Sequence, residues 1–216
     1  MALRLNGQTS GYVELDAPAV AGSNTLTLPN GNGTSGQYLQ TDGSGGLSWA
    51  GVTTGKILQV VSTAKTDTFS ESLAANTNSS TNCIQVQITP SSTSSKVLIM
   101  VTLHGSSTYW GGVSQGAYQG RLVKNGSNLV VGDTAGGRNR MTMRAGDGDG
   151  NSVEEGMAFT YLDSPSSTSL LTYGVRLDNV DNGAQTLYLN RSPDDGDTVV
   201  NITRTVSTIT AMEVAG

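Results

Sequence analysis

Seven glycines fall within Leu28–Val52, and they restrict what this part of the chain can form. Glycine interrupts a helix and weakens a long strand, so neither element can run through the whole segment. Asp42-Gly43 is a turn signal between two short extended pieces, Gly36–Thr41 and Gly46–Ala50. The segment therefore predicts a short hairpin.

Four larger side chains stand between these glycines, namely Tyr38, Leu39, Leu47 and Trp49. An isolated two-stranded hairpin is marginal in water and buries little apolar surface. We therefore expect these four residues to be buried between three chains in a glycine-rich neck, spanning residues 29–55, where glycine lets the backbones approach closely. A flexible Gly/Ser linker is the alternative interpretation.

The segment LPNGNGTSGQYLQTDGSGGLSWAG also resembles a known motif, LP followed by GQxLxTDGSGxLSW. This motif recurs in tail-fibre and other virion fibre proteins of tailed phages, marine ones especially. The C-terminal sequence STITAMEVAG resembles the same proteins more loosely. The resemblance implies a homotrimer located in the virion, fixed to the particle by an N-terminal arm, with its head turned outward.

Residues 1–28 carry only three charged side chains, Arg4, Glu14 and Asp16. Apolar residues occur in short bursts, which predict strands of a few residues between turns. No set of residues in this arm can form a core. We therefore expect residues 1–28 to lie on another virion protein, of the capsid or the tail.

The net charge of -5 makes nucleic acid an improbable partner. Charged residues make up 13% of the chain, against roughly a quarter in an average protein, and Ser, Thr, Asn and Gly take their place. This composition favours strands and turns over helices.

Cys83 is the only cysteine, so the chain cannot form an internal disulfide. The longest apolar stretch, Val97–Leu103, is far shorter than the ~20 residues that span a bilayer. No apolar run follows the first residues, so we expect no signal peptide and no membrane insertion. Synthesis in the host cytoplasm is the corresponding expectation.

Residues 56–216 read as a head domain built of about nine strands. Lys96–His104 is apolar on both faces, as in a central strand. Asn125-Gly126 separates two alternating runs within Gly116–Val131 and predicts a type I′ hairpin. The remaining strands are expected at Lys56–Ala64, Cys83–Ile88, Arg138–Arg144, Gly156–Leu162, Ser169–Asp178, Gln185–Arg191 and Thr205–Val214. The predicted fold class is all-β, with an antiparallel, jelly-roll-like β-sandwich as the head.

Signals for catalysis are weak. His104 is the only histidine, and its position at a strand end is typical of a hydrogen-bonded structural residue. Glu154 and Glu155 are neighbours on a strand and would point to opposite faces, which suits a carboxylate pair poorly. We therefore expect a protein that is not an enzyme, with a polysaccharide hydrolase as the remote alternative.

The spacing of Asp147, Asp149 and Asn151 matches the start of an EF-hand loop. The match then fails, because Ser152 and Ala158 stand where the motif needs glycine and glutamate. A loop calcium site of another type, with Glu154 or Glu155 as a further ligand, is the alternative to a plain acidic turn. We expect no metal and no cofactor.

Tyr109, Trp110 and Tyr118 bracket a Gly/Ser loop. Exposed aromatic rings stack on sugars, and loops at the end of a sandwich carry binding sites. These residues are candidates for contact with a host-surface glycan. A free-standing lectin-like module is therefore the second hypothesis beside a virion structural protein, and packing against the core or a neighbouring subunit is the alternative role of the rings.

Overall fold

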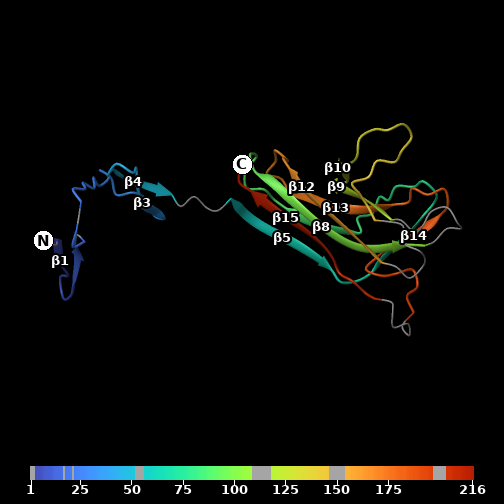
Figure 1. The fold of residues 1–216 in the computed structure, drawn as a ribbon, viewed down its shortest axis with the longest axis horizontal. Helices are drawn as coiled ribbons and strands as arrows, with labels where there is room; N and C mark the ends of the chain where they lie inside the picture. Colours follow the sequence, from blue (N-terminus) through green and yellow to red (C-terminus); the bar gives the residue numbers. More distant parts are fainter. Residues whose placement is uncertain are drawn as a thin grey trace. The chain divides into compact units, whose positions relative to one another are not determined.

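The computed structural model describes residues 3–16, 18–20, 22–51, 56–108, 118–145, 154–196 and 203–216. These residues form an all-β protein with no helix among them, as the sequence predicts. The chain divides into two units, Met1–Thr54 and Gly55–Gly216 (Figure 1).

Two separate hairpins make up the first unit. β1 (Leu3–Asn6) pairs antiparallel with β2 (Tyr12–Leu15), and β3 (Gln37–Thr41) pairs with β4 (Leu47–Gly51). A bridge between Thr27 and Gly46 attaches the intervening segment to the second hairpin. None of the described residues of this unit is fully buried, so these residues form no core of their own.

The turn of the second hairpin depends on glycine. Gly43 and Gly45 have positive φ angles of 81° and 98°, which side chains other than glycine rarely adopt. A Cβ on Gly45 would lie 2.2 Å from the carbonyl oxygen of Thr25. The Asp42 carboxylate accepts hydrogen bonds from the backbone N–H groups of Ser44 and Gly46, at 2.7 and 3.0 Å. The turn predicted at Asp42-Gly43 is therefore present.

The second unit is a β-sandwich of two antiparallel sheets, which confirms the predicted architecture. The small sheet has the order β10-β9-β13-β7, with β11 also paired to β9; its strands are β7 (Ile84–Ile88), β9 (Gln119–Lys124), β10 (Ser127–Val130), β11 (Met143–Arg144) and β13 (Leu171–Asp178). The large sheet has the order β5-β15-β8-β14-β6, with β12 also paired to β8; its strands are β5 (Ile57–Lys65), β6 (Phe69–Leu73), β8 (Lys96–Ser107), β12 (Glu155–Asp163), β14 (Gln185–Leu189) and β15 (Ser207–Val214).

β8 is the central strand of the large sheet, as predicted for Lys96–His104. It pairs with β12 along one edge and with β15 and then β14 along the other. Alternate residues of β8 face the small sheet and join its inward residues in one core. Its fully buried members include Ile88, Val97, Ile99, Leu103, Tyr118, Leu122, Tyr173, Val175, Leu177, Leu187, Leu189, Ile209 and Ala211.

The hairpin at Asn125-Gly126 matches its prediction. Ser127 pairs with Lys124, which leaves a two-residue loop. Asn125 and Gly126 both have positive φ, 50° and 83°, as a type I′ turn requires. Asn125 is held further by its side-chain oxygen, which accepts the backbone N–H of Thr172 at 2.9 Å.

Two strand predictions need correction. The alternation over Arg138–Arg144 produces only β11, because Arg138–Met141 has no ladder partner and lies in the loop after β10. β6 had no predicted counterpart, although Phe69 and Leu73 point inward along it. Its inward position 71 is a glutamate, which interrupts the apolar pattern; the Glu71 carboxylate accepts a hydrogen bond from Ser79 at 2.6 Å.

Candidate functional site

The four predicted neck residues all lie on the β3–β4 hairpin, but on both of its faces. Leu39 is directly opposite Trp49, and Leu47 is two residues from Trp49 on the same strand, so these three share one face. Tyr38 is opposite Ala50 on the other face. Tyr38 and Leu39 are 43% and 44% exposed, and Leu47 and Trp49 are half-buried.

Trp49 is partly covered by its own chain. Its indole N–H donates a hydrogen bond of 2.6 Å to the carbonyl oxygen of Gly31. A Cβ on Gly33 would lie 2.7 Å from the indole ring, so only glycine fits at this position, where φ is +68°. The segment before β3 thus folds over one side of the indole, which gives Gly33 a packing role.

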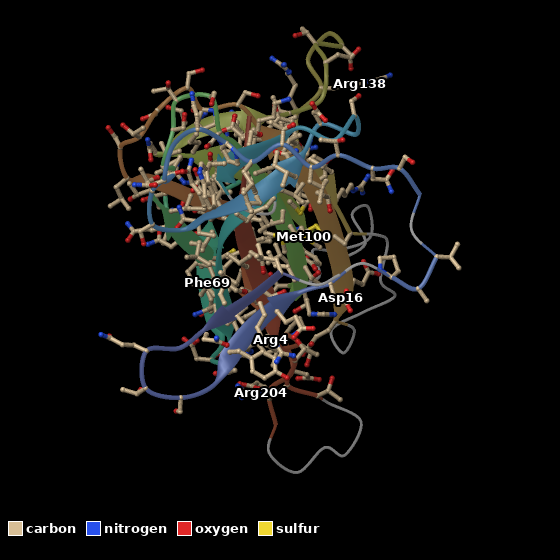
Figure 2. All side chains as sticks on the ribbon, turned by 90° about the vertical axis from the view of Figure 1, so that its left-hand side faces the viewer. Arg4, Asp16, Phe69, Met100, Arg138 and Arg204 are labelled. Carbon is tan, nitrogen blue, oxygen red and sulfur yellow. The ribbon has the colours of Figure 1, made fainter. Side chains whose placement is uncertain are left out.

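The β1–β2 hairpin has an apolar face and a polar face. Its register pairs Leu3 with Leu15 and Leu5 with Val13, and these four side chains share one face and are 57–66% exposed. On the other face Arg4, which is labelled in Figure 2, forms an ion pair of 2.7 Å with Glu14. Its guanidinium lies 4.0 Å from the centre of the Tyr12 ring. We call Leu3, Leu5, Val13 and Leu15 the hairpin face.

The sequence did not single out the hairpin face, although the alternation in LRLN and YVEL contains it. The signal is short, and only the pairing register places the two halves together. Apolar exposure continues along the first unit, where Val20, Leu26 and Leu28 are 93%, 68% and 69% exposed. The first unit is therefore rich in apolar surface that its described residues leave uncovered, and such surface is typical of a segment that binds another protein.

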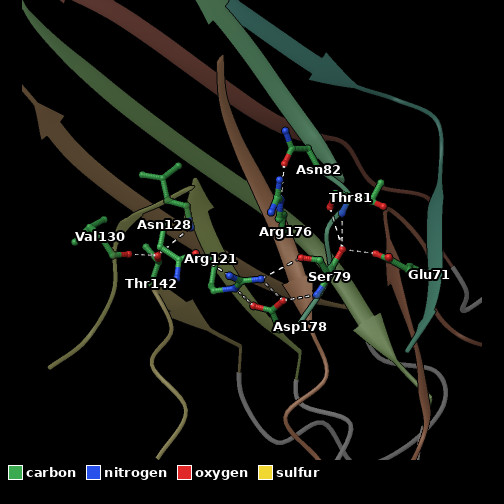
Figure 3. Close-up of polar contacts among 11 residues, drawn as sticks. Glu71, Ser79, Thr81, Asn82, Arg121, Asn128, Val130, Thr142, Arg176 and Asp178 are labelled. Atoms are coloured by element: carbon green, nitrogen blue, oxygen red, sulfur yellow. Dashed lines mark hydrogen bonds and ion pairs between the residues drawn. The ribbon is translucent and has the colours of Figure 1, made fainter. Parts of the chain in front are cut away.

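A buried ion pair lies on the small sheet of the second unit. Arg121 and Asp178 are 8% and 1% exposed and make a two-pronged contact (Figure 3). Arg121 also donates to Asn128 at 2.7 Å and to the carbonyl oxygen of Ser79 at 3.1 Å. The backbone N–H of Ser79 donates to Asp178 at 2.8 Å. These contacts engage Arg121 with three neighbours and fasten the segment around Ser79 to the sheet, which is a structural role.

The residues considered for catalysis each have contacts of their own. The ring of His104 has its Nδ1 atom 3.1 Å from the carbonyl oxygen of Val206. Glu154 accepts a hydrogen bond of 2.6 Å from Thr205. Glu154 and Glu155 each have one buried carboxylate oxygen without a hydrogen-bond partner.

The calcium candidates Asp147, Asp149 and Asn151 lie outside the described residues. Among the residues that the structure describes, no group of three or more His, Cys, Asp or Glu side chains is placed to hold a metal ion.

Of the three aromatic glycan candidates, Tyr109 and Trp110 lie outside the described part of the chain. Tyr118 is fully buried in the core of the sandwich. Its hydroxyl donates to the carbonyl oxygen of Glu155, and burial raises the pKa of the phenol. Because stacking on a sugar requires an exposed ring, Tyr118 acts here as a core residue.

A groove of about 660 Å³ lies beside the loop between β10 and β11. Three arginines line it, Arg138, Arg140 and Arg144, together with Gln119 and one acidic residue, Asp133. Arg138 is carried on the loop itself (Figure 2). Arg140 donates from Nε to the carbonyl oxygen of Gly132 at 2.6 Å, which fixes the direction of its guanidinium. A basic groove of this kind suits an anionic ligand.

Comparisons with known proteins leave the family open. No protein-family model matches the sequence, and a search of the curated proteins finds no match. A search of the described residues for a helix long and apolar enough to cross a membrane finds none. The geometry of the two units must therefore support any functional assignment.

Proposed function

We propose that this chain is a structural protein of a phage particle. In this proposal it is a homotrimeric short fibre or decoration protein with a jelly-roll-like head. Its first unit joins it to the particle and to its own copies. The observation that carries the proposal is the hairpin face, four apolar side chains on an isolated two-stranded ribbon, each more than half exposed.

Energetics support this assignment. Fixing the backbone of one residue costs roughly 1–2 kcal/mol, and an isolated hairpin recovers little of it. Burying apolar surface returns about 25 cal/mol per Å². The compensation for residues 1–28 therefore comes from another surface, for which the proposal names a capsid or tail protein. The β3–β4 hairpin, with Leu39, Leu47 and Trp49 on one face, supplies the contact between copies.

The proposed role requires no catalytic step. His104 is engaged by a backbone carbonyl, and the ion pair of Arg121 and Asp178 is enclosed by hydrogen bonds. Both arrangements support a structural rather than a reactive function for these residues.

The test changes the hairpin face without changing the rest of the chain. Leu5→Asp places a charge on the hairpin face, and Asn6→Asp places the same charge on the opposite face of the same strand. The expected result is that L5D fails to attach to particles that lack this protein, while N6D attaches like wild type. Attachment is measured by electron cryo-microscopy of the particles. Normal occupancy by L5D would contradict the proposal.

A second candidate function is binding of an acidic host-surface glycan by the head. The groove lined by Arg138, Arg140 and Arg144 favours it, since guanidinium groups pair with carboxylates and phosphates. We expect Arg138→Ala with Arg140→Ala to weaken binding of uronate-containing oligosaccharides on a glycan array. Unchanged binding would show that any glycan site lies outside this groove.

A further inference from the structure

The outer face of the large sheet contains no charged residue over three successive rows of cross-strand neighbours. Each row crosses β5, β15, β8 and β12, which lie side by side (Figure 1). The rows are Ala64, Thr208, Thr102, Ala158; then Ser62, Thr210, Met100, Thr160; then Val60, Met212, Leu98, Leu162. We call these twelve residues, seven of them apolar and five Ser or Thr, the apolar face.

The apolar face is open to solvent in the single chain. Val60, Met100 and Leu162 are 54%, 43% and 45% exposed, and Leu98 and Met212 are half-buried. In an antiparallel sheet with one face on the core, the other face is normally polar. β8 instead places Leu98 and Met100 on its outer side, between Lys96 and Thr102. Outward apolar residues in the middle of a strand are typical of a strand with both faces covered.

The outer face of the small sheet provides an internal contrast. There β7 presents Gln85 and Gln87, and β13 presents Thr172 and Arg176. Gln87 donates to Thr172 at 3.0 Å, and Arg176 donates to Asn82 at 3.0 Å. These positions of the small sheet present amide and charged side chains, whereas the apolar face presents neither, so general composition does not account for the apolar face.

Some polar groups of the apolar face would keep their hydrogen-bond partners if another surface covered it. Ser62 and Thr210 are cross-strand neighbours and share a hydrogen bond of 2.8 Å between their hydroxyl oxygens. The hydroxyl of Ser62 also lies 3.4 Å from the carbonyl oxygen of Ile209. Hydroxyls that are already paired within the chain cost less to bury than unpaired ones.

We propose that the apolar face packs against the same face of neighbouring copies of this chain. Interfaces between identical subunits are depleted in charge at their centre and more apolar than other interfaces. A face without charge meets its own copy without electrostatic repulsion, whereas a charged partner would gain nothing from it. This inference rests on the proposed homotrimer and adds a second contact region, on the head.

The dimensions fit such a contact. Four strands spaced ~4.8 Å apart, with three alternate residues each and therefore about six residues at ~3.3 Å, give a face of roughly 380 Å². A standard interface buries about 800 Å² per partner. The apolar face is therefore large enough to be the centre of a subunit interface. The rest of the interface area would come from contacts of the first unit.

Cysteine labelling of the full chain tests the proposal. Cys83 is 3% exposed, so an introduced cysteine is the only reactive one in the folded protein. Met100→Cys marks the apolar face, whose residue Met100 is labelled in Figure 2, and Gln87→Cys is the control on the exposed polar face. The mass in solution and the rate of maleimide labelling are measured on the same samples at micromolar concentration.

The expected result is an oligomer in which M100C reacts at least tenfold more slowly than Q87C, and in which a short bis-maleimide joins two copies through M100C only. A variant M100C that is folded but no longer oligomeric, beside an oligomeric Q87C, would equally support the contact. Leu162→Cys, on the adjacent strand, repeats the test at a second position of the apolar face.

Two outcomes overturn the proposal and are distinguishable. An oligomer in which M100C, L162C and Q87C react at equal rates would contradict the head contact but not the proposed trimer. A wild-type chain that is monomeric at these concentrations removes both the trimer and the head contact.

Discussion

The two units of this protein place their apolar side chains in opposite ways. In the second unit, alternate residues of each sheet face the other sheet and are fully buried, as Ile99 and Leu177 are. In the first unit, residues of the same kind, such as Leu5 and Val13, lie on two-stranded ribbons and remain more than half exposed. A strand pattern therefore predicts burial only where a second layer exists to receive it.

The largest expected effect concerns the buried ion pair of Arg121 and Asp178. This pair tests whether the second unit is stable through its own contacts. Arg121→Ala leaves the Asp178 carboxylate buried without its main partner, and we expect the head to lose about 3–5 kcal/mol of unfolding free energy. The control is Arg4→Ala, which removes an exposed ion pair from the first unit and is expected to cost less than about 1 kcal/mol. Urea unfolding of both variants measures the difference, and equal losses would contradict the contrast between the units.

Trp49→Ala tests the opposite property in the first unit. We expect it to weaken assembly by roughly 2–4 kcal/mol per contact while the melting temperature of the dissociated head stays unchanged. Sedimentation at several concentrations measures assembly, and calorimetry measures the head. If the mutant trimer were as stable as wild type at micromolar concentration, Trp49 would not belong to the interface.

Glu213 gives a pH-dependent prediction for the second unit. Burial alone would raise the pKa of this carboxyl, but hydrogen bonds from Ser91 and Gln59 outweigh it and lower the pKa to about 2. In the unfolded chain the group titrates near 4.3, so the unfolded state binds the proton first as the pH falls. The stabilisation is complete at neutral pH and is lost between about pH 5 and pH 2.

We expect Glu213→Gln to cost roughly 1–3 kcal/mol at pH 7 and to flatten this part of the pH–stability curve. Urea unfolding at a series of pH values checks both effects. An unchanged slope between pH 5 and pH 2 would show that other carboxylates carry the acid sensitivity.

Gly126→Val forces a β-branched residue into positive φ and should destabilise the head by more than about 1 kcal/mol. The matched control is Gly137→Val, at a loop position where a Cβ meets no atom within 4 Å and φ is not positive. This control is expected to stay within about 0.5 kcal/mol of wild type. Thermal unfolding compares the two, and equal shifts would contradict the role of the turn.

The smallest expected effect concerns Cys83, whose thiol should not react in the folded protein. Burial raises the pKa of the Cys83 thiol to about 12, so the native protein should not react with a thiol reagent at pH 8. Labelling should begin only as the head unfolds. Rapid labelling of the folded chain would place Cys83 outside the core.

The fold class was predictable because period-two alternation and turn chemistry act locally. Val86 and Ile88 predict a core-facing strand, and Asn125-Gly126 predicts the type I′ turn between β9 and β10. The partners of the strands were not predictable from such patterns. The local sequence of β8 does not indicate that Leu98 and Met100 face outward, because their exposure depends on the number of layers in the fold.

The candidate sites divide in the same way. Leu39 and Trp49 were predicted as contact residues, and the register places them opposite each other. The hairpin face was missed because Leu3 and Leu15 are brought together only by the pairing of β1 with β2. Tyr118 was misjudged because an aromatic residue beside a Gly/Ser loop looks the same whether its ring points to solvent or to the core.

The pairing of β5 with β15 has a consequence for the order of synthesis. Lys65 is opposite Ser207, and Val61 is opposite Ala211, so the first strand of the head has its ladder partner about 150 residues later. A growing chain therefore exposes β5, with its apolar alternation, until β15 has left the ribosome. The β1–β2 hairpin closes over only a few residues, so both of its strands emerge together. During translation all residues of the β1–β2 hairpin are thus available for pairing early, whereas the sandwich can close only when its last strand has emerged.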